Sequence, residues 1–315
     1  MVRYIYMYIY LSVLVVEMVR WKNKTGKPYK DKRDWKKYNE ELVVRGEFLL
    51  DLDWITISWE EELQQMNKGK VGAPYQFPES LISLQGIWHG WIDFRGIEGI
   101  TRKVVELAQI PDFNDYSTIN RRVNKLQLDL ELPKQGFVSV STDATGIKLN
   151  NAGEYRHEKY GKTKKRFIKV TISANPLTKD LLDFEASLEG EGLSEPDIAI
   201  KHMQQQIDNG VIVDKFWGDG TYDVKKLFNF LERNQTESAI KIRENASDSS
   251  KGSMRRAREV REYKSKRYAD WARDKQYGLR WLGTEVIISA VKRKFGEKVR
   301  SKNTENMFRE AKMKF

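Results

Sequence analysis

Residues 137–143 read Phe-Val-Ser-Val-Ser-Thr-Asp, and this heptapeptide decides the fold class of the second half of the chain. Apolar and small polar residues alternate in it, which is typical of a strand with one buried face. Residues 166–174 and 181–187 are expected as two further strands around a turn at Asn175-Pro176. Because no helical pattern separates the three strands, they are predicted to form an antiparallel meander.

The elements that follow alternate between helix and strand. They are expected as a helix over 195–208, a strand over 211–218, a helix from about 223, a strand over 239–242, a basic helical stretch over 251–275 and a helix over 284–295. Three strands followed by helix, strand, helix, strand and helix is the element order of the RNase H-like fold. The predicted class is therefore α/β, with a mixed sheet of three antiparallel strands followed by parallel strands and helices.

Residues 34–126 lack this alternation and are expected to be helices and loops. Apolar residues recur at helical spacing in Gly96–Ile110, and Ser117 is placed to cap a further helix that carries Arg121 and Arg122. Two short helices joined by a turn, the second with a basic face, resemble a helix-turn-helix, so both arginines are candidate DNA contacts. A plain helical bundle that packs or dimerises is the alternative interpretation.

The charge of the chain points to a polyanionic partner. Lys and Arg number 56 against 45 Asp and Glu, a formal net charge of +11. Residues 251–315 alone hold 20 basic and eight acidic residues, a net charge of +12. Excess cations attract nucleic acids and release their counterions, so Arg255 and Arg256 in this stretch are candidate phosphate contacts. A solvated basic face without a partner is the alternative.

Cysteine is absent, and the three histidines, His89, His157 and His202, lie far apart. The composition excludes disulfides, thiolate zinc sites and cysteine nucleophiles, and no His-x-x-x-His spacing occurs. Any bound metal would therefore be held by carboxylates, which favours Mg²⁺ or Mn²⁺. The lack of cysteine also agrees with a reducing compartment, so a cytoplasmic, nucleoid-associated protein is expected.

Three carboxylates are the candidate site. Asp143 is expected to end the first strand and Asp219 the fourth, where the sequence reads Trp-Gly-Asp-Gly-Thr-Tyr-Asp over 217–223. Carboxyl ends of adjacent strands share one crevice, and Glu285 in the first turn of the last helix can lean over it. Two Mg²⁺ ions about 4 Å apart would neutralise the three charges and serve phosphodiester chemistry. The alternative is that these residues are structural. Asp143 and Asp219 would then be ordinary turn residues, Glu285 a partner of the helix dipole and Asp223 a helix cap.

The order of these motifs is similar to that of a known family. The segment Tyr277–Glu285 followed by Lys292 resembles the Tyr-Arg-Glu-Lys signature of bacterial and archaeal insertion-sequence DDE transposases. Residues 143–148 and 160–166 resemble the family's region around its first aspartate, and residues 217–223 resemble the region around its second. Residues 35–46 and 115–122 resemble the insertion-sequence-five family. Together they cover about residues 34–315. One departure is that four residues separate Arg280 from Glu285, where the usual pattern has three.

The resemblance implies a DNA transposase that cuts and joins DNA with two metal ions, Mg²⁺ or Mn²⁺. By it, the metal ligands and catalytic residues would be Asp143, Asp219 and Glu285. The residues that contact DNA near the site would be Tyr277, Arg280 and Lys292. The partner would be double-stranded DNA, as element ends and as target, bound by a homodimer and without a membrane. A nuclease that only hydrolyses DNA, and an inactive DNA-binding remnant, are the alternatives.

The domain organisation expected is a helical DNA-binding domain over 18–130 and a catalytic domain over 131–315 with a basic helical insertion at about 245–276. Residues 1–17 are expected to be a non-native extension upstream of a natural start at Met18. Their apolar run, Tyr4–Val16, has a signal or anchor as its alternative interpretation. The helical pattern over 305–315 has no stop signal, which predicts truncation at the C-terminus.

Overall fold

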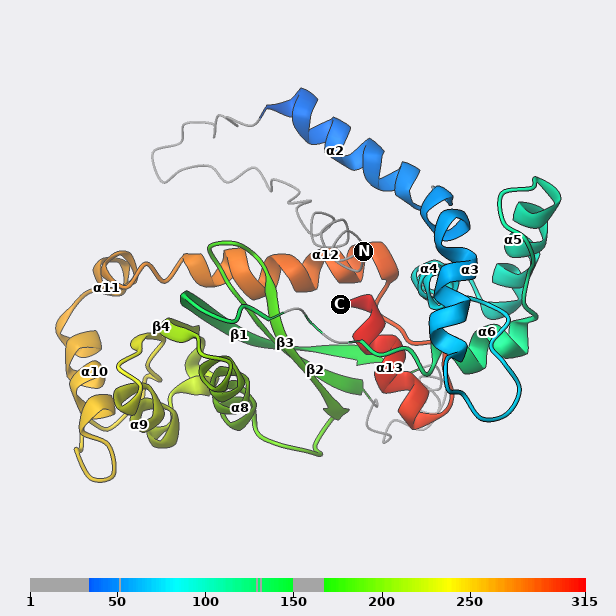
Figure 1. Cartoon of the computed structure of the whole chain (residues 1–315). Helices are drawn as coiled ribbons and strands as arrows, with labels where there is room; N and C mark the ends of the chain where they lie inside the picture. The colour runs from blue at the N-terminus through cyan, green and yellow to red at the C-terminus, as the bar shows by residue number, and fades with distance from the viewer. Residues whose placement is uncertain (1–33, 51, 129, 131, 150–166) are drawn as a thin grey trace, which may run out of the picture. The chain divides into compact units, whose positions relative to one another are not determined.

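The computed structural model describes residues 34–315 except 51, 129, 131 and 150–166 (Figure 1). The expectations for residues 1–17, for the start at Met18 and for 160–166 lie outside the described residues. The chain divides into two compact units, one up to Leu128 and one from Asp129 to Met313. Each unit is described by itself below. Among the described residues, no helix is long and apolar enough to cross a membrane.

The described part of the first unit is helical. Its helices are α2 (Trp35–Phe48), α3 (Asp53–Asn67), α4 (Glu79–His89), α5 (Phe94–Glu106) and α6 (Tyr116–Val123). Buried apolar side chains of α4, α5 and α6 form its core around a buried amide pair, in which Gln85 Nε2 donates to Asn114 Oδ1 at 2.6 Å. The cap of α6 differs from the expectation: Asp115, not Ser117, accepts the N-terminal amides, because α6 begins two residues earlier.

The second unit is built on a five-stranded mixed sheet. The strands are β1 (Phe137–Lys148), β2 (Phe167–Ala174), β3 (Leu181–Leu188), β4 (Ile212–Gly218) and β5 (Glu237–Ile240), in the order β3-β2-β1-β4-β5. The pairs β1–β2 and β2–β3 are antiparallel, whereas β1–β4 and β4–β5 are parallel. This arrangement confirms the predicted mixed α/β sheet, and it is consistent with the RNase H-like fold.

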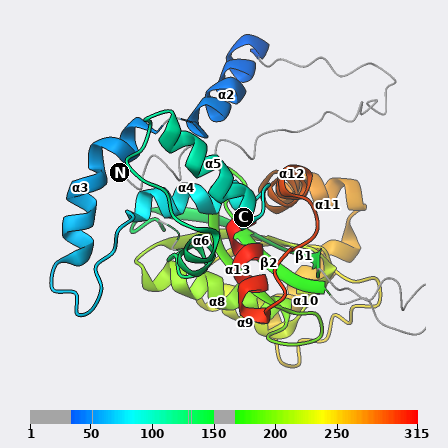
Figure 2. The ribbon, with the colours of Figure 1, turned by 90° about the vertical axis from the view of Figure 1, so that its right-hand side faces the viewer.

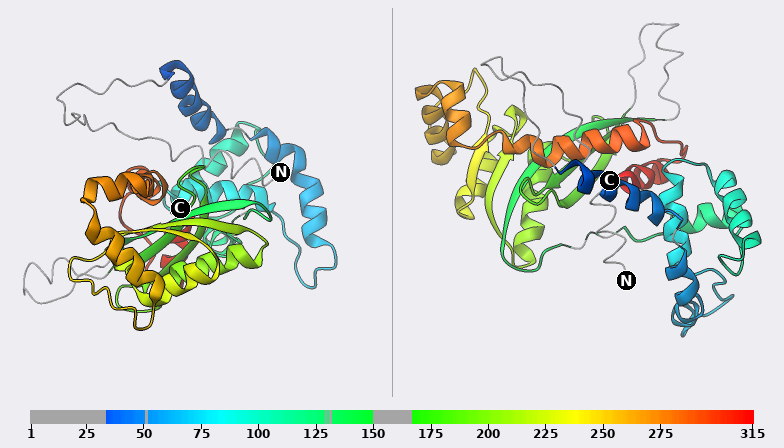
Figure 3. Two further views of the ribbon diagram at one scale, coloured as in Figure 1. Left: turned by 90° about the vertical axis from the view of Figure 1, so that its left-hand side faces the viewer. Right: turned by 90° about the horizontal axis from the view of Figure 1, so that it is seen from above.

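Helices cover both faces of this sheet. They are α8 (Glu195–Asp208), α9 (Lys225–Arg233), α10 (Met254–Ser265), α11 (Tyr268–Asp274), α12 (Val286–Phe295) and α13 (Thr304–Lys314). The three directions of view agree that α8 and α12 lie on opposite faces (Figures 1, 2 and 3). The basic stretch over 251–275 is two helices rather than one, because the chain leaves the helical conformation at Lys266.

The length of β1 corrects one expectation. Asp143 does not end the strand, which continues to Lys148 through antiparallel pairing with β2. The parallel pairing with β4, however, stops at Ser141 opposite Trp217. Asp143 therefore lies just beyond the point where β4 leaves the sheet, and only one of its two flanks is covered by a neighbouring strand.

Candidate active site

Asp143 and Asp219 occupy equivalent places on neighbouring parallel strands. Each lies two residues beyond the register pair Ser141–Trp217. Side chains alternate between the faces of a sheet, so both aspartates belong to the same face as that pair. The face is the one that carries Arg280 and Thr284, because Ser141 Oγ lies 3.5 Å from the Arg280 carbonyl oxygen and from Thr284 Oγ1.

A short turn holds Asp219 where β4 ends. The turn is η2 (Gly220–Tyr222), and Thr221 N donates to Asp219 Oδ1 at 2.7 Å. Arg243 crosses the turn, with Nε donating to the Gly220 carbonyl at 2.6 Å and Nη2 to the Thr221 carbonyl at 3.2 Å. These bonds occupy the backbone acceptors of the turn and fix the direction in which Asp219 leaves β4.

Asp223 has a different role from the helix cap expected for it. The helix α9 begins at Lys225, and its N-cap, Val224, has no side-chain cap bond. Asp223 is buried and accepts from Arg256 at 2.6 Å (Nε) and 3.0 Å (Nη2), and from Arg243 N at 3.2 Å. This two-pronged ion pair ties the η2 turn to α10.

An aromatic cluster anchors the segment that leads into α12 to strand β4. Trp217, Trp271 and Tyr277 are buried against one another. Trp217 Nε1 donates to the Gln276 carbonyl at 3.2 Å, and Tyr277 Oη donates to the Gly218 carbonyl at 3.3 Å. Burial raises the pKa of Tyr277 to about 12, so the phenol stays protonated. The DNA contact expected of Tyr277 stays a prediction; in the structure its buried ring holds the end of β4 next to Asp219.

The extra residue between Arg280 and Glu285 is accommodated by a π-helical turn. This turn, η3 (Trp281–Glu285), leads directly into α12. In a π-turn the backbone bonds connect residues five apart, so Arg280 and Glu285 return to the same side of the helix. Gly283 packs tightly on β1: a Cβ atom there would lie 3.1 Å from Ser141 Cβ and 3.3 Å from Pro176 Cα. The unusual spacing therefore keeps both functional side chains on the sheet.

Arg280 connects two of the candidate carboxylates. Its Nη2 donates to Glu285 Oε1 at 2.5 Å, and its Nη1 lies 3.5 Å from Asp143 Oδ2. The Arg280 side chain is 11% exposed, and its Cζ lies 5.7 Å from the ring centroid of Tyr277 and 6.0 Å from that of Trp281. Strand β1 and the π-helical turn thus bring Asp143 next to Arg280 and Glu285, which are remote from it in sequence.

The surroundings of Asp143 change its ionisation. The pKa of Asp143 is raised to about 6, chiefly by burial and further by the negative charges of Asp219 and Glu285. The amide of Ala144, which donates to Asp143 Oδ1 at 2.9 Å, and the charge of Arg280 oppose this rise. The cluster thus carries more negative charge than one arginine neutralises, and a cation would relieve it.

The chemistry of these side chains fits a hard divalent cation, whereas their present arrangement does not. Carboxylate oxygens are the ligands that Mg²⁺ and Mn²⁺ prefer. Among the residues that the structure describes, however, no three acidic or histidine side chains are grouped closely enough to hold one ion. The Arg280 guanidinium lies between Asp143 and Glu285 and keeps those two apart.

Glu195 is a fourth acidic residue near the site that was not expected from the sequence. It opens α8, beside the carboxyl end of the sheet, and is half-buried. Its pKa is raised, first by burial and then by the charge of Asp219. Burial, and then the charges of Glu195 and Asp219, also raise the pKa of Tyr222. The Tyr222 hydroxyl is buried and has no hydrogen-bond partner among the described residues. In the sequence, Glu195 is indistinguishable from an ordinary acidic residue in a first helical turn.

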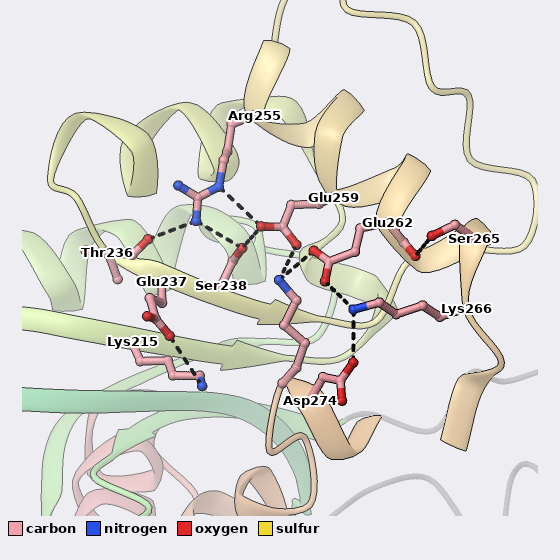
Figure 4. Close-up of polar contacts among 11 residues, drawn as sticks. Lys215, Thr236, Glu237, Ser238, Arg255, Glu259, Glu262, Ser265, Lys266 and Asp274 are labelled. Atoms are coloured by element: carbon pink, nitrogen blue, oxygen red, sulfur yellow. Dashed lines mark hydrogen bonds and ion pairs between the residues drawn. The ribbon is translucent and has the colours of Figure 1, made fainter. Parts of the chain in front are cut away.

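The basic side chains proposed as DNA contacts divide into inward and outward groups. Arg255 donates to the Thr236 carbonyl and lies 3.3 Å from Glu259, within a network of paired charges that includes Lys266 and Asp274 (Figure 4). Arg256 is 12% exposed because it pairs with Asp223. Both arginines are paired within the protein, and the DNA contact expected of them stays a prediction. Outward-facing basic residues on α10 are Arg258 and Arg261, each paired with an exposed carboxylate.

In the first unit, the two candidate arginines also differ. Arg121 is exposed, and its Nη2 lies 3.3 Å from Thr118 Oγ1. Arg122 donates to the Phe77 carbonyl at 3.2 Å and lies over the Tyr75 ring, and burial lowers its pKa. Arg121 thus remains available to a partner, whereas Arg122 holds helix α6 to the loop between α3 and α4.

Lys292 lies two helical turns beyond Glu285 on α12. Its Nζ is 3.7 Å from Glu297 Oε1, too far for a hydrogen bond, and its side chain is partly exposed. A side chain of this length and freedom can reach a phosphate that enters the site from solvent.

Comparison with known protein families agrees with this geometry. The sequence model of a family described as "Transposase DDE domain" matches residues 136–315, which is more than half of the chain and contains the whole sheet. A second model with the same description matches residues 43–152. The family has DNA as its substrate, and its members cut nucleic acid. The chain therefore belongs to the transposases with a DDE domain.

Proposed function

We propose that the protein catalyses metal-dependent cleavage and strand transfer of an insertion sequence, with Asp143, Asp219 and Glu285 as its catalytic carboxylates. The observation that supports this most is that one guanidinium contacts both Asp143 and Glu285, on the sheet face where Asp219 follows the neighbouring strand β4. The finer resemblance, to insertion-sequence-five elements with the Tyr-Arg-Glu-Lys signature, remains part of the proposal.

The carboxylates would hold two Mg²⁺ or Mn²⁺ ions, which supply a deprotonated hydroxyl for attack and a Lewis acid for the leaving oxygen. Asp143 and Asp219 orient the site because the sheet fixes their backbones. Glu285 closes it from the π-helical turn. Lys292 and Arg280 are within reach of the scissile phosphate and its neighbours, where charge-assisted hydrogen bonds hold the strand in line for attack.

The test is an assay of a duplex that carries one element end, with Mg²⁺, with Mn²⁺ and with a chelator. Cleavage at the end followed by joining to a second duplex is expected only with metal. Cleavage without joining would assign the protein to the hydrolytic nucleases. Binding of the end without cleavage in either metal would assign it to the inactive DNA-binding remnants.

The outward arginines of α10 give a prediction on DNA affinity. Replacing both Arg258 and Arg261 with glutamine is expected to weaken DNA binding and to reduce the slope of log affinity against log salt by about two. Their present partners are exposed carboxylates, and such surface pairs are weak enough to exchange for phosphates.

The matched control is Arg255→Gln on the same helix. It removes the same charge from an inward position, so it is expected to lower the free energy of unfolding and to leave the salt slope unchanged. Fluorescence anisotropy of a labelled duplex across a salt series measures the DNA affinity and its dependence on salt. If the Arg258 and Arg261 double variant kept the slope of the unmodified protein, α10 would be a solvated face and not a DNA contact.

A further inference from the structure

Arg280 lies between two of the candidate carboxylates. It bonds Glu285 at 2.5 Å and approaches Asp143 at 3.5 Å, and its side chain is largely buried. Its Nε is also buried and has no hydrogen-bond partner among the described residues. One of its donors is thus unsatisfied, which makes the bridge costlier than a complete one.

A guanidinium and a metal ion cannot be bound by the same two carboxylates in the same way. Oxygen ligands lie about 2.1 Å from Mg²⁺, so two ligands of one ion approach each other closely. Oxygens that accept from opposite ends of a guanidinium are held further apart by the width of the group itself. Two cations in one small, water-poor space would also repel each other strongly.

We propose that Arg280 is an internal counter-ion that a divalent cation displaces when the site becomes active. The proposal rests on the assignment of Asp143 and Glu285 as metal ligands. Before metal binds, Arg280 lessens the repulsion between the buried carboxylates and stabilises the metal-free protein. When metal binds, the carboxylates close on the ion and the guanidinium leaves.

The surroundings of Arg280 offer it a second position. The exposed ring of Trp281 and the ring of Tyr277 flank the guanidinium, and planar cations stack favourably on such faces. A guanidinium released toward Trp281 moves to the solvent side of the site, where a DNA phosphate would accept its two parallel donors. Metal binding would therefore strengthen phosphate binding, and because linkage is reciprocal, phosphate binding would strengthen metal binding by the same factor.

The experiment measures Mn²⁺ affinity without DNA, from the electron paramagnetic resonance signal of the free ion at pH 8. Arg280→Gln is expected to bind Mn²⁺ about tenfold more tightly than the unmodified protein, because the ion no longer has to displace a charge-assisted hydrogen bond. The matched control is Arg233→Gln, an exposed arginine at the end of α9, which changes the net charge equally. Its affinity should stay within about twofold, because solvent and salt screen a remote charge.

Thermal unfolding gives a readout that is independent of DNA cleavage. Without metal, Arg280→Gln should melt below the unmodified protein, and saturating Mn²⁺ should raise its melting temperature by more than it raises that of the unmodified protein. If Arg280→Gln fails to fold, Arg280→Met replaces it: methionine keeps the apolar stem and has no charge to bridge the carboxylates, so tighter Mn²⁺ binding is expected there too.

The outcomes separate the two hypotheses. Equal Mn²⁺ affinities in Arg280→Gln and Arg233→Gln, with Asp143→Asn binding the ion more weakly, would overturn the displacement of Arg280 but keep the metal site. Unchanged Mn²⁺ affinity in Asp143→Asn would overturn the metal site itself. Tighter binding in Arg280→Gln together with weaker binding in Asp143→Asn supports both.

Discussion

Replacing Asp143 with asparagine is expected to slow metal-dependent DNA cleavage by about a thousandfold or more, because a ligand charge worth several kcal/mol to the transition state is lost. The fold should survive. The pKa of Asp143 is raised to about 6 in the folded protein, above its ordinary value of 3.8, so its ionised form costs stability at neutral pH. Removing that charge should therefore not lower the melting temperature.

The matched control is Asp208→Asn at the end of α8, where the carboxylate is exposed and accepts only from Gln204 among the described contacts. It makes the same chemical change and should cleave at the unmodified rate. Asp219→Asn and Glu285→Gln should behave as Asp143→Asn does, because two ions need all three charges. Single-turnover cleavage of an end-containing duplex measures the rates. Cleavage by Asp143→Asn at the rate of the control would remove Asp143 from the mechanism.

The fold was predictable where local signals and periodicity agree. The bounds of α8 follow from Pro196 in its first turn and Asn209-Gly210 after its end, and the structure has the helix where the sequence predicts it. The alternation in 137–143 likewise predicts a strand. Its end was misplaced because the ladder with β2, not the local sequence, decides how far β1 continues. Strand ends depend on partners that the sequence does not name.

The site was predictable in residue type but not in arrangement. The aspartates follow from their places relative to two strands, and the structure confirms that β1 and β4 are neighbours. The departure in spacing before Glu285 could be seen in the sequence, but not the π-helical turn that absorbs it. That turn depends on the close packing of Gly283 against Ser141 and Pro176, which are remote in sequence.

The direction of the α10 arginines could not be read from charge. Four arginines occur within seven residues of that helix, and nothing local distinguishes those that face inward. Arg256 faces inward because Asp223, 33 residues earlier, lies beneath it. A basic run therefore predicts an interface only through those side chains that lack a buried carboxylate as partner.

The Asp223–Arg256 pair leads to the largest expected effect on stability. Replacing either residue with alanine should lower the free energy of unfolding by about 3–5 kcal/mol, because it leaves the other charge buried and unpaired. This exceeds the ~1 kcal/mol that loss of a helix cap would cost. Chemical denaturation of each variant measures the free energy of unfolding. Replacing both should cost less than the sum of the two single changes, with a coupling energy of about 1–3 kcal/mol.

The exposed pair Arg258–Glu232, whose arginine lies on the same helix, is the matched control, and its coupling energy should stay below about 1 kcal/mol. A second consequence distinguishes the pair from an ordinary core contact. Asp223 also accepts from Arg243 N, and Arg243 holds the turn that directs Asp219. Asp223→Ala should therefore weaken Mn²⁺ binding at a temperature where the variant is fully folded. Intact metal affinity together with the full loss of stability would show that the pair supports α10 and the core without guiding Asp219.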